Sequence, residues 1–299
     1  MNRKVLIASL LLFTVLLAGC AQQQGGETGQ ETPAHGEMST PEETKNTGSS
    51  ELSGTLTIAG STTVLPITQE CGRLFQQEHP DVRVSVSGGG SGHGVKASAA
   101  GEIDIGAASR DVKPEEKDNY PDLKVYDIGK DSVAIVVHPS NPVSDLTLEQ
   151  ASKIFSGENT NWNEVGGPNK DIHVVSRETG SGTREVFENY VMDPFDNEIN
   201  AKLTKPSNGE IRATVSKDEA AIGYLSLGYV DKSIKALNID GVEPTESNVI
   251  SGDYPIVRTL HLMTKGEPSQ LEQAFLDFVM SEEGQQVVEE QGYIKMPST

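Results

Sequence analysis

The chain from Gly54 onward alternates predicted strands with predicted helices. Apolar residues recur at every second position over residues 55–59, 82–87 and 103–108, which predicts strands. Helical spacing of apolar residues predicts a first helix starting near Thr62 or Thr63, because Pro66 is tolerated only in a first turn. A short helix is expected over residues 95–100. This order predicts an α/β domain with a mainly parallel sheet.

The rest of the chain continues the pattern with longer polar connections. Strands are predicted at 124–126 and 132–137, on either side of a polar link at 127–131. Further helices are expected at 147–155, 182–192, 210–216 and 271–289, and further strands at 172–176, 221–224 and 254–263. Cys71 falls on the apolar side of the first helix, so we expect it to be a small buried side chain.

Residues 1–52 show neither the strand spacing nor the helix spacing of apolar residues. They have the features of a targeting segment followed by a tether. Arg3 and Lys4 precede an apolar run that is too short for a comfortable membrane span. The run ends in Leu17-Ala18-Gly19-Cys20, which resembles the lipobox of bacterial lipoproteins. An ordinary secretory signal or an N-terminal membrane anchor is the alternative.

We therefore expect a signal peptide at residues 1–19 and lipidation of Cys20. Residues 20–52 are rich in Gln, Gly, Glu, Ser and Thr, which predicts a disordered tether. The protein would then be exported and anchored by lipid on the outer face of the cytoplasmic membrane, at the cell surface or in the periplasm.

Charge and composition narrow the candidate chemistry. The formal net charge of the 299-residue chain is −20, which argues against nucleic acid as a partner. It does not argue against a small anion, because aimed dipoles and one arginine act at contact. The six histidines have no metal-ligand spacing, so neither a metal nor another cofactor is predicted.

Three segments rich in Gly, Ser and Thr each follow a predicted strand and open a predicted helix. They are Gly60–Thr63, Gly88–Gly94 and Arg177–Thr183. N–H groups at a helix N-terminus lack intrahelical acceptors and carry partial positive charge, so they bind anions. Any one segment alone is also typical of an ordinary helix cap. Three together, with Arg177 leading the third, predict an anion site.

The order of these motifs carries a family resemblance. GSTTVLPI, SGGGSGHG, IGAASRD, RETGSGTRE and AIGYLSLGYV follow a lipobox and a polar tether. In this the chain resembles the phosphate-binding lipoprotein of the ABC-type phosphate uptake system, over about residues 54–299. The resemblance implies a two-lobed periplasmic-binding-protein fold of type II, in which each lobe is a mixed sheet flanked by helices. Two strands would form the hinge.

The resemblance also implies boundaries, partners and a ligand set. Lobe 1 would comprise residues 53–130 and 253–299, and lobe 2 residues 131–252. The protein would be a monomer that delivers inorganic phosphate to an ABC permease. The implied phosphate contacts are Ser61, Thr62, Thr63, Ser91, Arg177, Ser181, Gly182 and Thr183.

One position departs from the family pattern. Many members place Asp directly after the Ser that ends the third strand, where its carboxylate accepts the phosphate proton and rejects sulfate. Here Arg110 follows Ser109, and Asp111 comes one residue later. Either Asp111 still reaches the ligand as the proton acceptor, or Arg110 adds a second cation to the phosphate contacts. Arg110 as a hinge salt bridge is the third reading.

Two other functions stay open on the sequence alone. Arg110 in place of Asp favours a binding protein for another tetrahedral oxyanion, such as sulfate or molybdate. A secreted phosphatase or serine hydrolase is less favoured, because the residues around Ser181 do not form a G-x-S-x-G elbow. We therefore expect a binding protein and not an enzyme.

Overall fold

The computed structural model describes residues 52–297. The predicted signal peptide, Cys20 and nearly all of the predicted tether lie outside the described residues. Within residues 52–297, no helix is both long enough and apolar enough to cross a membrane.

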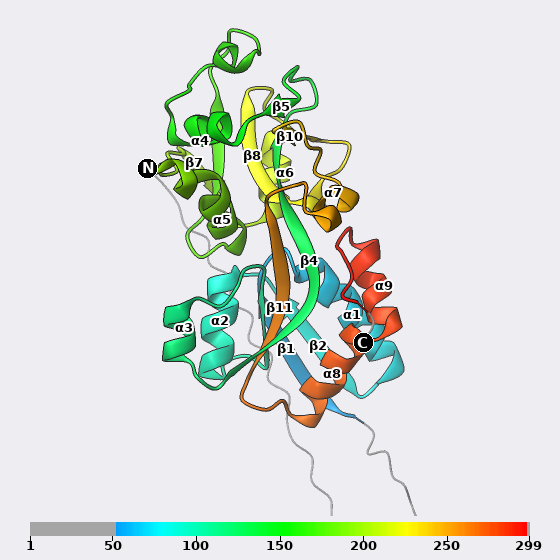
Figure 1. The fold of residues 1–299 in the computed structure, drawn as a ribbon. Helices are drawn as coiled ribbons and strands as arrows, with labels where there is room; N and C mark the ends of the chain where they lie inside the picture. The colour runs from blue at the N-terminus through cyan, green and yellow to red at the C-terminus, as the bar shows by residue number, and fades with distance from the viewer. Residues whose placement is uncertain (1–51, 298–299) are drawn as a thin grey trace, which may run out of the picture. The chain divides into compact units, whose positions relative to one another are not determined.

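Helices and strands alternate along the described chain (Figure 1). The strands are β1 (Gly54–Gly60), β2 (Val82–Ser87), β3 (Ile105–Ala108), β4 (Leu123–Val137), β5 (Asp145–Leu146), β6 (His173–Arg177), β7 (Leu203–Lys205), β8 (Ala221–Ser226), β9 (Lys235–Ala236), β10 (Asn238–Ile239) and β11 (Val257–Lys265). The α-helices are α1 (Leu65–Glu78), α2 (Ser91–Ala100), α3 (Pro114–Asn119), α4 (Leu148–Ser156), α5 (Gly182–Phe187), α6 (Asn208–Val215), α7 (Glu246–Ser251), α8 (Gln270–Met280) and α9 (Glu282–Glu290).

The main sheet has the order β2-β1-β3-β11-β4-β8-β6-β7, with β9 added on β4. β1 pairs in parallel with β2 and β3, and β6 pairs in parallel with β7 and β8. β11 and β4 lie between these two groups and pair antiparallel with their neighbours. The predicted parallel arrangement is therefore confirmed within each group, and the sheet as a whole is mixed.

Two long strands connect the two groups, as Figure 1 shows for β4 and β11. The lower part of β4 pairs with β11, and its upper part pairs with β8. Residues 127–131, predicted as a link between two strands, are part of one continuous 15-residue strand. The link was predicted from the polar side chains of Asp127, Lys130 and Asp131. That prediction was wrong, because the backbone pairing with β11 continues past these residues with a single register shift.

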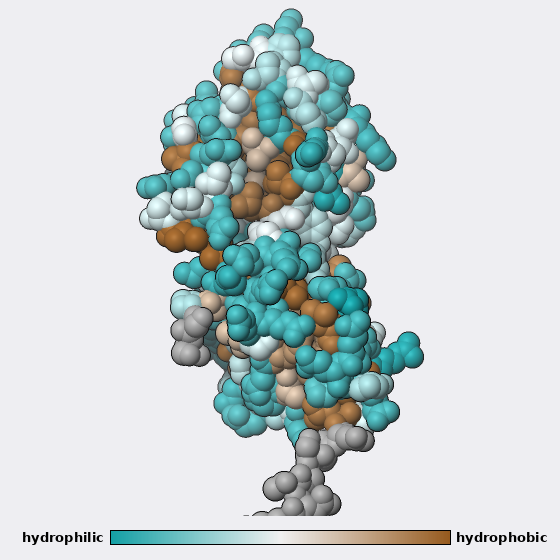
Figure 2. All heavy atoms as spheres, turned by 90° about the vertical axis from the view of Figure 1, so that its right-hand side faces the viewer, coloured by the Kyte–Doolittle hydropathy of each residue, from teal (hydrophilic) through white to brown (hydrophobic). Residues whose placement is uncertain are grey.

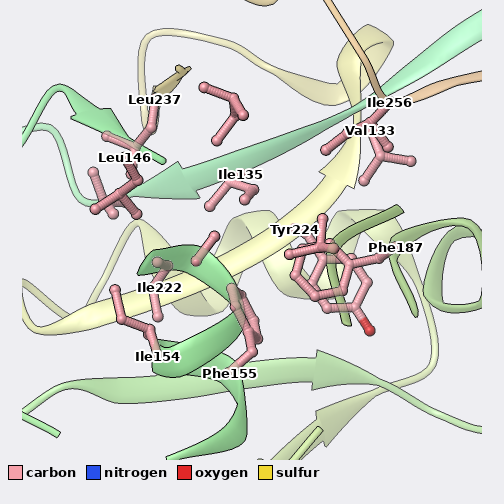
Figure 3. Close-up of a cluster of buried hydrophobic side chains, with 14 of the residues drawn as sticks. Val133, Ile135, Leu146, Ile154, Phe155, Phe187, Ile222, Tyr224, Leu237 and Ile256 are labelled. Atoms are coloured by element: carbon pink, nitrogen blue, oxygen red, sulfur yellow. The ribbon is translucent and has the colours of Figure 1, made fainter. Parts of the chain in front are cut away.

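Each group of strands has its own hydrophobic core. One core joins Leu56, Ile58 and Ile105 to Leu260 and helices α1, α8 and α9. The other joins Val133, Ile135 and Tyr224 to Phe155 and Phe187 (Figure 3). Cys71 is fully buried in the first core, as predicted, and burial raises the pKa of its thiol to about 12.

Several helix boundaries differ from the sequence-based expectation. The first helix begins at Leu65, because the Ser61 hydroxyl accepts the N–H groups of Thr63 and Val64 in a preceding turn. α2 begins at Ser91, inside the glycine-rich segment. A Cβ at Gly94 would lie 2.3 Å from the carbonyl oxygen of Ala107, so this helix needs glycine to pack on β3.

The predicted helix at 271–289 is two helices, α8 and α9. Ser281 between them has an extended backbone, and its hydroxyl caps α9 by accepting the N–H of Gly284. Apolar spacing alone misses such a break because both helices bury their apolar residues in the same core.

The surface is polar over most of the face drawn in Figure 2, with apolar residues gathered in separate patches. Large apolar side chains that are exposed include Tyr190, Leu203, Ile250 and Met280. Buried polar side chains, by contrast, lie in the loops at the strand ends, and these loops matter for function.

Candidate anion-binding site

The carboxyl ends of the parallel strands carry the loops predicted to bind an anion. Carboxyl ends of parallel strands meet at one edge of a sheet, where open α/β proteins bind ligands. β1, β2 and β3 end in the first set of loops, and β6 and β7 end in the second. The two sets touch, because the N–H of Gly92 donates to the carbonyl of Gly180 at 3.0 Å.

Buried hydroxyl groups line the contact between the two sets of loops. Thr63 Oγ1 lies 3.3 Å from Thr183 Oγ1, and Ser91 Oγ lies 3.4 Å from Ser109 Oγ. All four side chains are almost completely buried. A Cβ at Gly182 would lie only 2.3 Å from Ser91 Oγ, so glycine permits this close approach.

Several backbone N–H groups at this contact have no acceptor in the described part of the chain. Among residues 52–297, none is found for the N–H of Thr62, Ser91, Gly182 or Thr183. Buried N–H groups are nearly always paired, so unpaired ones at helix starts indicate a place for an anion or water. Ser61 and Ser181 differ, because their hydroxyls accept backbone N–H groups of their own loops, from Thr63 and from Arg184 respectively.

Arg177 is a buried cation without an anionic partner among residues 52–297. Its guanidinium donates to the carbonyls of Lys205 and Pro206, to Asn208 Oδ1 at 3.0 Å and to Thr62 Oγ1 at 3.2 Å. No carboxylate lies within ion-pair distance of it in the described part of the chain. Burial lowers the pKa of Arg177 to about 10. A bound anion would compensate this charge.

The second core fixes the position of Arg177. Tyr224 stacks on Phe187 with ring centroids 4.0 Å apart, and Figure 3 shows the two rings lying against each other. The Tyr224 hydroxyl accepts the N–H of Arg177 at 3.2 Å and lies 2.7 Å from Ser176 Oγ. The end of β6 is therefore tied to a rigid aromatic pair.

A second buried arginine reaches the same place from β11. Arg258 donates through Nη2 to Thr63 Oγ1 at 3.1 Å and through Nη1 to Thr183 Oγ1 at 2.9 Å and to Ser109. It also forms an ion pair with Asp131 of β4, at 2.6 Å and 2.9 Å to Oδ2. Burial raises the pKa of Asp131, and the charge and hydrogen bonds of Arg258 oppose that shift.

Arg110 and Asp111 lie apart from these contacts. Arg110 forms a bidentate pair with Glu116, at 2.7 Å and 2.8 Å, and its Nε lies 3.1 Å from Glu185. The Asp111 carboxylate is 88% exposed and lies 3.2 Å from His261, which also contacts Asp127. The structure thus does not bring Arg110 or Asp111 to the hydroxyl cluster, and their ligand contacts stay a prediction.

The sequence reasoning missed Arg258, Asp131, Asn208 and Ser109 as members of this cluster. A signal for Arg258 was present: it is in phase with Leu260 and Leu262 on β11, which are buried. A charged residue on the buried side of a strand indicates a buried partner. Asn208 had no comparable signal. It opens α6 and donates to Thr62 Oγ1 and Thr63 Oγ1, at 3.3 Å and 2.9 Å.

Clefts formed by the described residues border the cluster. A cleft of about 340 Å³ is lined by Thr62, Gly90 and Ser181, one residue from each predicted loop, and by neighbouring residues. A larger cleft of about 680 Å³ has Arg258 in its lining. No group of three or more His, Cys, Asp and Glu side chains within residues 52–297 is arranged to hold a metal ion.

Two groups of strands, each with its own hydrophobic core, are joined by two long strands and meet at a buried polar contact. This arrangement defines a two-lobed binding-protein fold. A family model described as PBP superfamily domain matches residues 45–283. The phosphate-binding protein PstS of Bacillus subtilis is 34% identical over 98% of this chain and 94% of its own length. The chain belongs to the PBP superfamily and, within it, to the family of PstS phosphate-binding proteins.

Solved structures agree with this assignment. A putative phosphate ABC transporter substrate-binding protein from Clostridium perfringens, solved with bound phosphate, is 39% identical, with a TM-score of 0.77. The match covers 82% of this chain and 100% of that one. An ABC-type phosphate transport receptor from Vibrio cholerae is 35% identical over 81% of this chain and 100% of its own, with a TM-score of 0.67.

Proposed function

We propose that this protein captures inorganic phosphate between its two lobes and delivers it to an ABC permease. The observation that carries this proposal is the buried charge of Arg177, which no described carboxylate pairs, next to hydroxyls and N–H groups that converge from both lobes. An isolated buried charge is strongly unfavourable, so the site gains stability when an anion enters. The names of the relatives specify phosphate among such anions.

The contacts that support phosphate binding are those at the junction of the loops. Thr62, Thr63, Ser91, Gly182 and Thr183 offer hydroxyl or N–H donors there. Ser61 and Ser181 would shape the loops through their caps, and each hydroxyl, which accepts an N–H through its oxygen, keeps its own proton to donate to the anion. We keep all seven, with Arg177, as the proposed set.

We propose that the two lobes are built on the two hydrophobic cores. The chain would leave lobe 1 through residues 127–132 of β4. It would return through residues 257–260 of β11, a few residues after the boundary at 253 that the resemblance implies, since Tyr254 and Ile256 pack in the lobe 2 core and Leu260 in the lobe 1 core. Such a two-strand connection suits a hinge that opens for entry and closes on the ligand.

Export and lipid anchoring complete the proposal. The lipobox-like Leu17-Ala18-Gly19-Cys20 and the polar segment after it support an anchor at Cys20 and a tether. This would hold a monomeric receptor next to its permease, and catalysis forms no part of the proposed role.

Calorimetry of phosphate binding by Arg177→Gln tests the assignment. We expect the variant to lose about 1.5–3 kcal/mol of binding free energy, the value of a charge-assisted hydrogen bond. Arg73→Gln is the matched control, because Arg73 forms only an exposed pair with Glu70. Unchanged phosphate affinity in Arg177→Gln would remove Arg177 from the site. An absence of phosphate binding by the unaltered chain would refute the function itself.

A further inference from the structure

Two tyrosine hydroxyls hold successive carbonyl groups of the first anion loop from behind. The Tyr229 hydroxyl donates to the carbonyl of Thr62 at 2.7 Å, and the Tyr293 hydroxyl donates to the carbonyl of Thr63 at 2.8 Å. Neither tyrosine belongs to the loop or to any group of residues so far placed at the anion site. The two side chains come from distant parts of the chain and meet on adjacent peptide groups.

The sequence of the loop explains why one of these carbonyls needs a donor from elsewhere. The N–H of Leu65 donates to the carbonyl of Ser61, four residues earlier. The same spacing would place the N–H of residue 66 on the carbonyl of Thr62, but residue 66 is proline and has no N–H. The Tyr229 hydroxyl occupies this position instead. Without it, the Thr62 carbonyl would lose its hydrogen bond at a buried contact.

Tyr229 reaches Thr62 from the opposite lobe. It ends a short 3-10 helix, η4 (Leu227–Tyr229), which follows β8 directly and packs on the lobe 2 core around Ile211 and Leu225. Arg212 of α6 lies over the Tyr229 ring, 5.8 Å from its centroid, and donates to the Tyr229 carbonyl at 3.4 Å. Burial raises the pKa of Tyr229, so its hydroxyl keeps the proton that it donates. Because Tyr229 is fixed to lobe 2, opening the lobes would break its bond to Thr62.

Tyr293 approaches from the other side and belongs to the lobe 1 core. Its ring lies against η4, where a Cβ added at Gly228 would be 2.7 Å from the ring. The neighbouring Ile294 exchanges two backbone hydrogen bonds with Lys130 of β4, at 2.8 Å and 2.9 Å. Tyr293 therefore stays with Thr63 in both the open and the closed arrangement, whereas Tyr229 joins them only on closure.

The held carbonyls fix where the Ser61 hydroxyl donates its proton. In a planar trans peptide the carbonyl and the following N–H point in opposite directions. Fixing the carbonyls of Thr62 and Thr63 therefore aims the N–H groups of Thr63 and Val64, which donate to Ser61 Oγ at 3.1 Å and 3.4 Å. Because the oxygen of Ser61 accepts these two bonds, its proton is left to donate away from the loop, toward an anion.

We propose that Tyr229 is a positioning residue that couples closure of the lobes to the geometry of the anion loop. On closure its hydroxyl takes the carbonyl of Thr62 and, with Tyr293 on the next carbonyl, locks the peptide groups that aim the Ser61 hydroxyl at the anion. This inference rests on the proposed phosphate function. Tyr229 itself does not touch the anion, so its effect is on how long a captured anion is retained.

The test is Tyr229→Phe in the full chain, which removes one hydroxyl and keeps the ring. We expect phosphate affinity, measured by calorimetry, to fall about tenfold. The dissociation rate, measured by chasing labelled phosphate with unlabelled phosphate, should rise by about the same factor, because the lost bond forms only after the anion has entered. The urea midpoint without phosphate should not change, since the open form lacks this bond.

Tyr254→Phe is the matched control. The Tyr254 hydroxyl also donates to a buried backbone carbonyl, that of Val133 at 3.0 Å, but both residues lie in the lobe 2 core. This variant should lower the urea midpoint and leave phosphate affinity and release unchanged. Tyr293→Phe should do both, lowering the midpoint and weakening phosphate binding, because its bond to Thr63 is present in the open and the closed forms.

A double variant tests the path through Ser61. If Tyr229 acts by aiming the Ser61 hydroxyl, the losses of affinity in Tyr229→Phe and Ser61→Ala are not independent. The combined loss should be smaller than the product of the two single losses, by about threefold or more. Losses that simply multiply would show that Tyr229 does not act through Ser61, which overturns this part of the proposal.

The remaining outcomes separate the inference from the function on which it rests. Tyr229→Phe that binds and releases phosphate like the unaltered chain overturns the role of Tyr229. A lower urea midpoint without phosphate, together with an unchanged dissociation rate, would make Tyr229 a purely structural residue and also overturns it. If the unaltered chain does not bind phosphate, the proposed function fails, whatever the variants do.

Discussion

At the scale of single residues, Gly182 shows how closely the two lobes approach each other. A methyl group at this position would lie 2.3 Å from Ser91 Oγ and 3.0 Å from Ser109 Oγ, and neither serine has room to move because both are buried. The motif Arg177–Thr183 was recognisable in the sequence. The partner across the contact was not, because Ser91 lies on another strand end and meets Gly182 only in the folded chain.

We therefore expect Gly182→Ala to weaken phosphate binding without unfolding either lobe. The added Cβ separates the loops and lengthens the contacts that an anion makes with both of them. The loss of phosphate-binding free energy should be about 1–3 kcal/mol, the usual effect of forcing extra volume into a packed contact. Calorimetry gives the affinity and urea unfolding gives the stability. Gly209→Ala is the control, because a Cβ there meets only Ser207 Oγ, at 3.9 Å, and this glycine of α6 has no positive φ.

At the scale of secondary-structure elements, Arg110 joins β3 to α3 and α5. It forms a bidentate pair with Glu116 of α3 and lies next to Glu185 of α5. Glu116 also accepts the N–H of Lys113 and so caps its own short helix. A hinge salt bridge was one interpretation of Arg110 from the sequence; the structure shows ion pairs with Glu116 and Glu185, and neither partner lies on β4 or β11.

Arg110→Ala should lower the free energy of unfolding by about 3 kcal/mol or more, because it leaves the Glu116 carboxylate buried without its partner. Arg73→Ala, which breaks an exposed pair, should change it by less than about 1 kcal/mol. Urea unfolding monitored by circular dichroism measures both. Equal small effects would mean that the Arg110 pair contributes no more than a surface contact.

The same pair predicts a dependence on pH. Burial tends to raise the pKa of Glu116, but the hydrogen bonds from Arg110 and Lys113 outweigh it and the pKa lies below the usual value. A lowered pKa in the folded state contributes stability above the unfolded-state pKa, and this contribution is lost as pH falls through the folded-state pKa. In Arg110→Ala this acid-side loss should shrink, as unfolding curves recorded at several acidic pH values would show.

At the scale of the whole molecule, closure is held by contacts that cross between lobes. Tyr229 donates to the carbonyl of Thr62, Arg177 donates to the hydroxyl of Thr62, and Gly92 donates to Gly180. The structure thus shows the lobes in contact. Because Arg177 has no carboxylate partner and several N–H groups have no acceptor among the described residues at this contact, the closed form should be less favourable without an anion.

We expect the radius of gyration of the protein to decrease when phosphate is added, as measured by small-angle X-ray scattering. Phosphate at 100 times its dissociation constant should also stabilise the fold by about 2.7 kcal/mol. Arg177→Gln at the same phosphate concentration should show smaller effects, with a stabilisation of only about 0.3–1.3 kcal/mol, because its affinity is lower by about 1.5–3 kcal/mol. A radius that stays constant while calorimetry reports binding would mean that the lobes do not move on capture.

The sequence by itself determined the α/β class, the three helix-opening loops, the burial of Cys71 and the family. These follow from local rules: alternation of apolar residues, glycine and hydroxyl residues after strands, and motif order. Only the tertiary structure decided which polar groups meet. It joined residues 127–131 into β4, brought Arg258 and Asp131 to the loops, and tied Arg110 to Glu116. The physical reason is that ion pairing between distant residues depends on strand order and register, which local residue patterns do not encode.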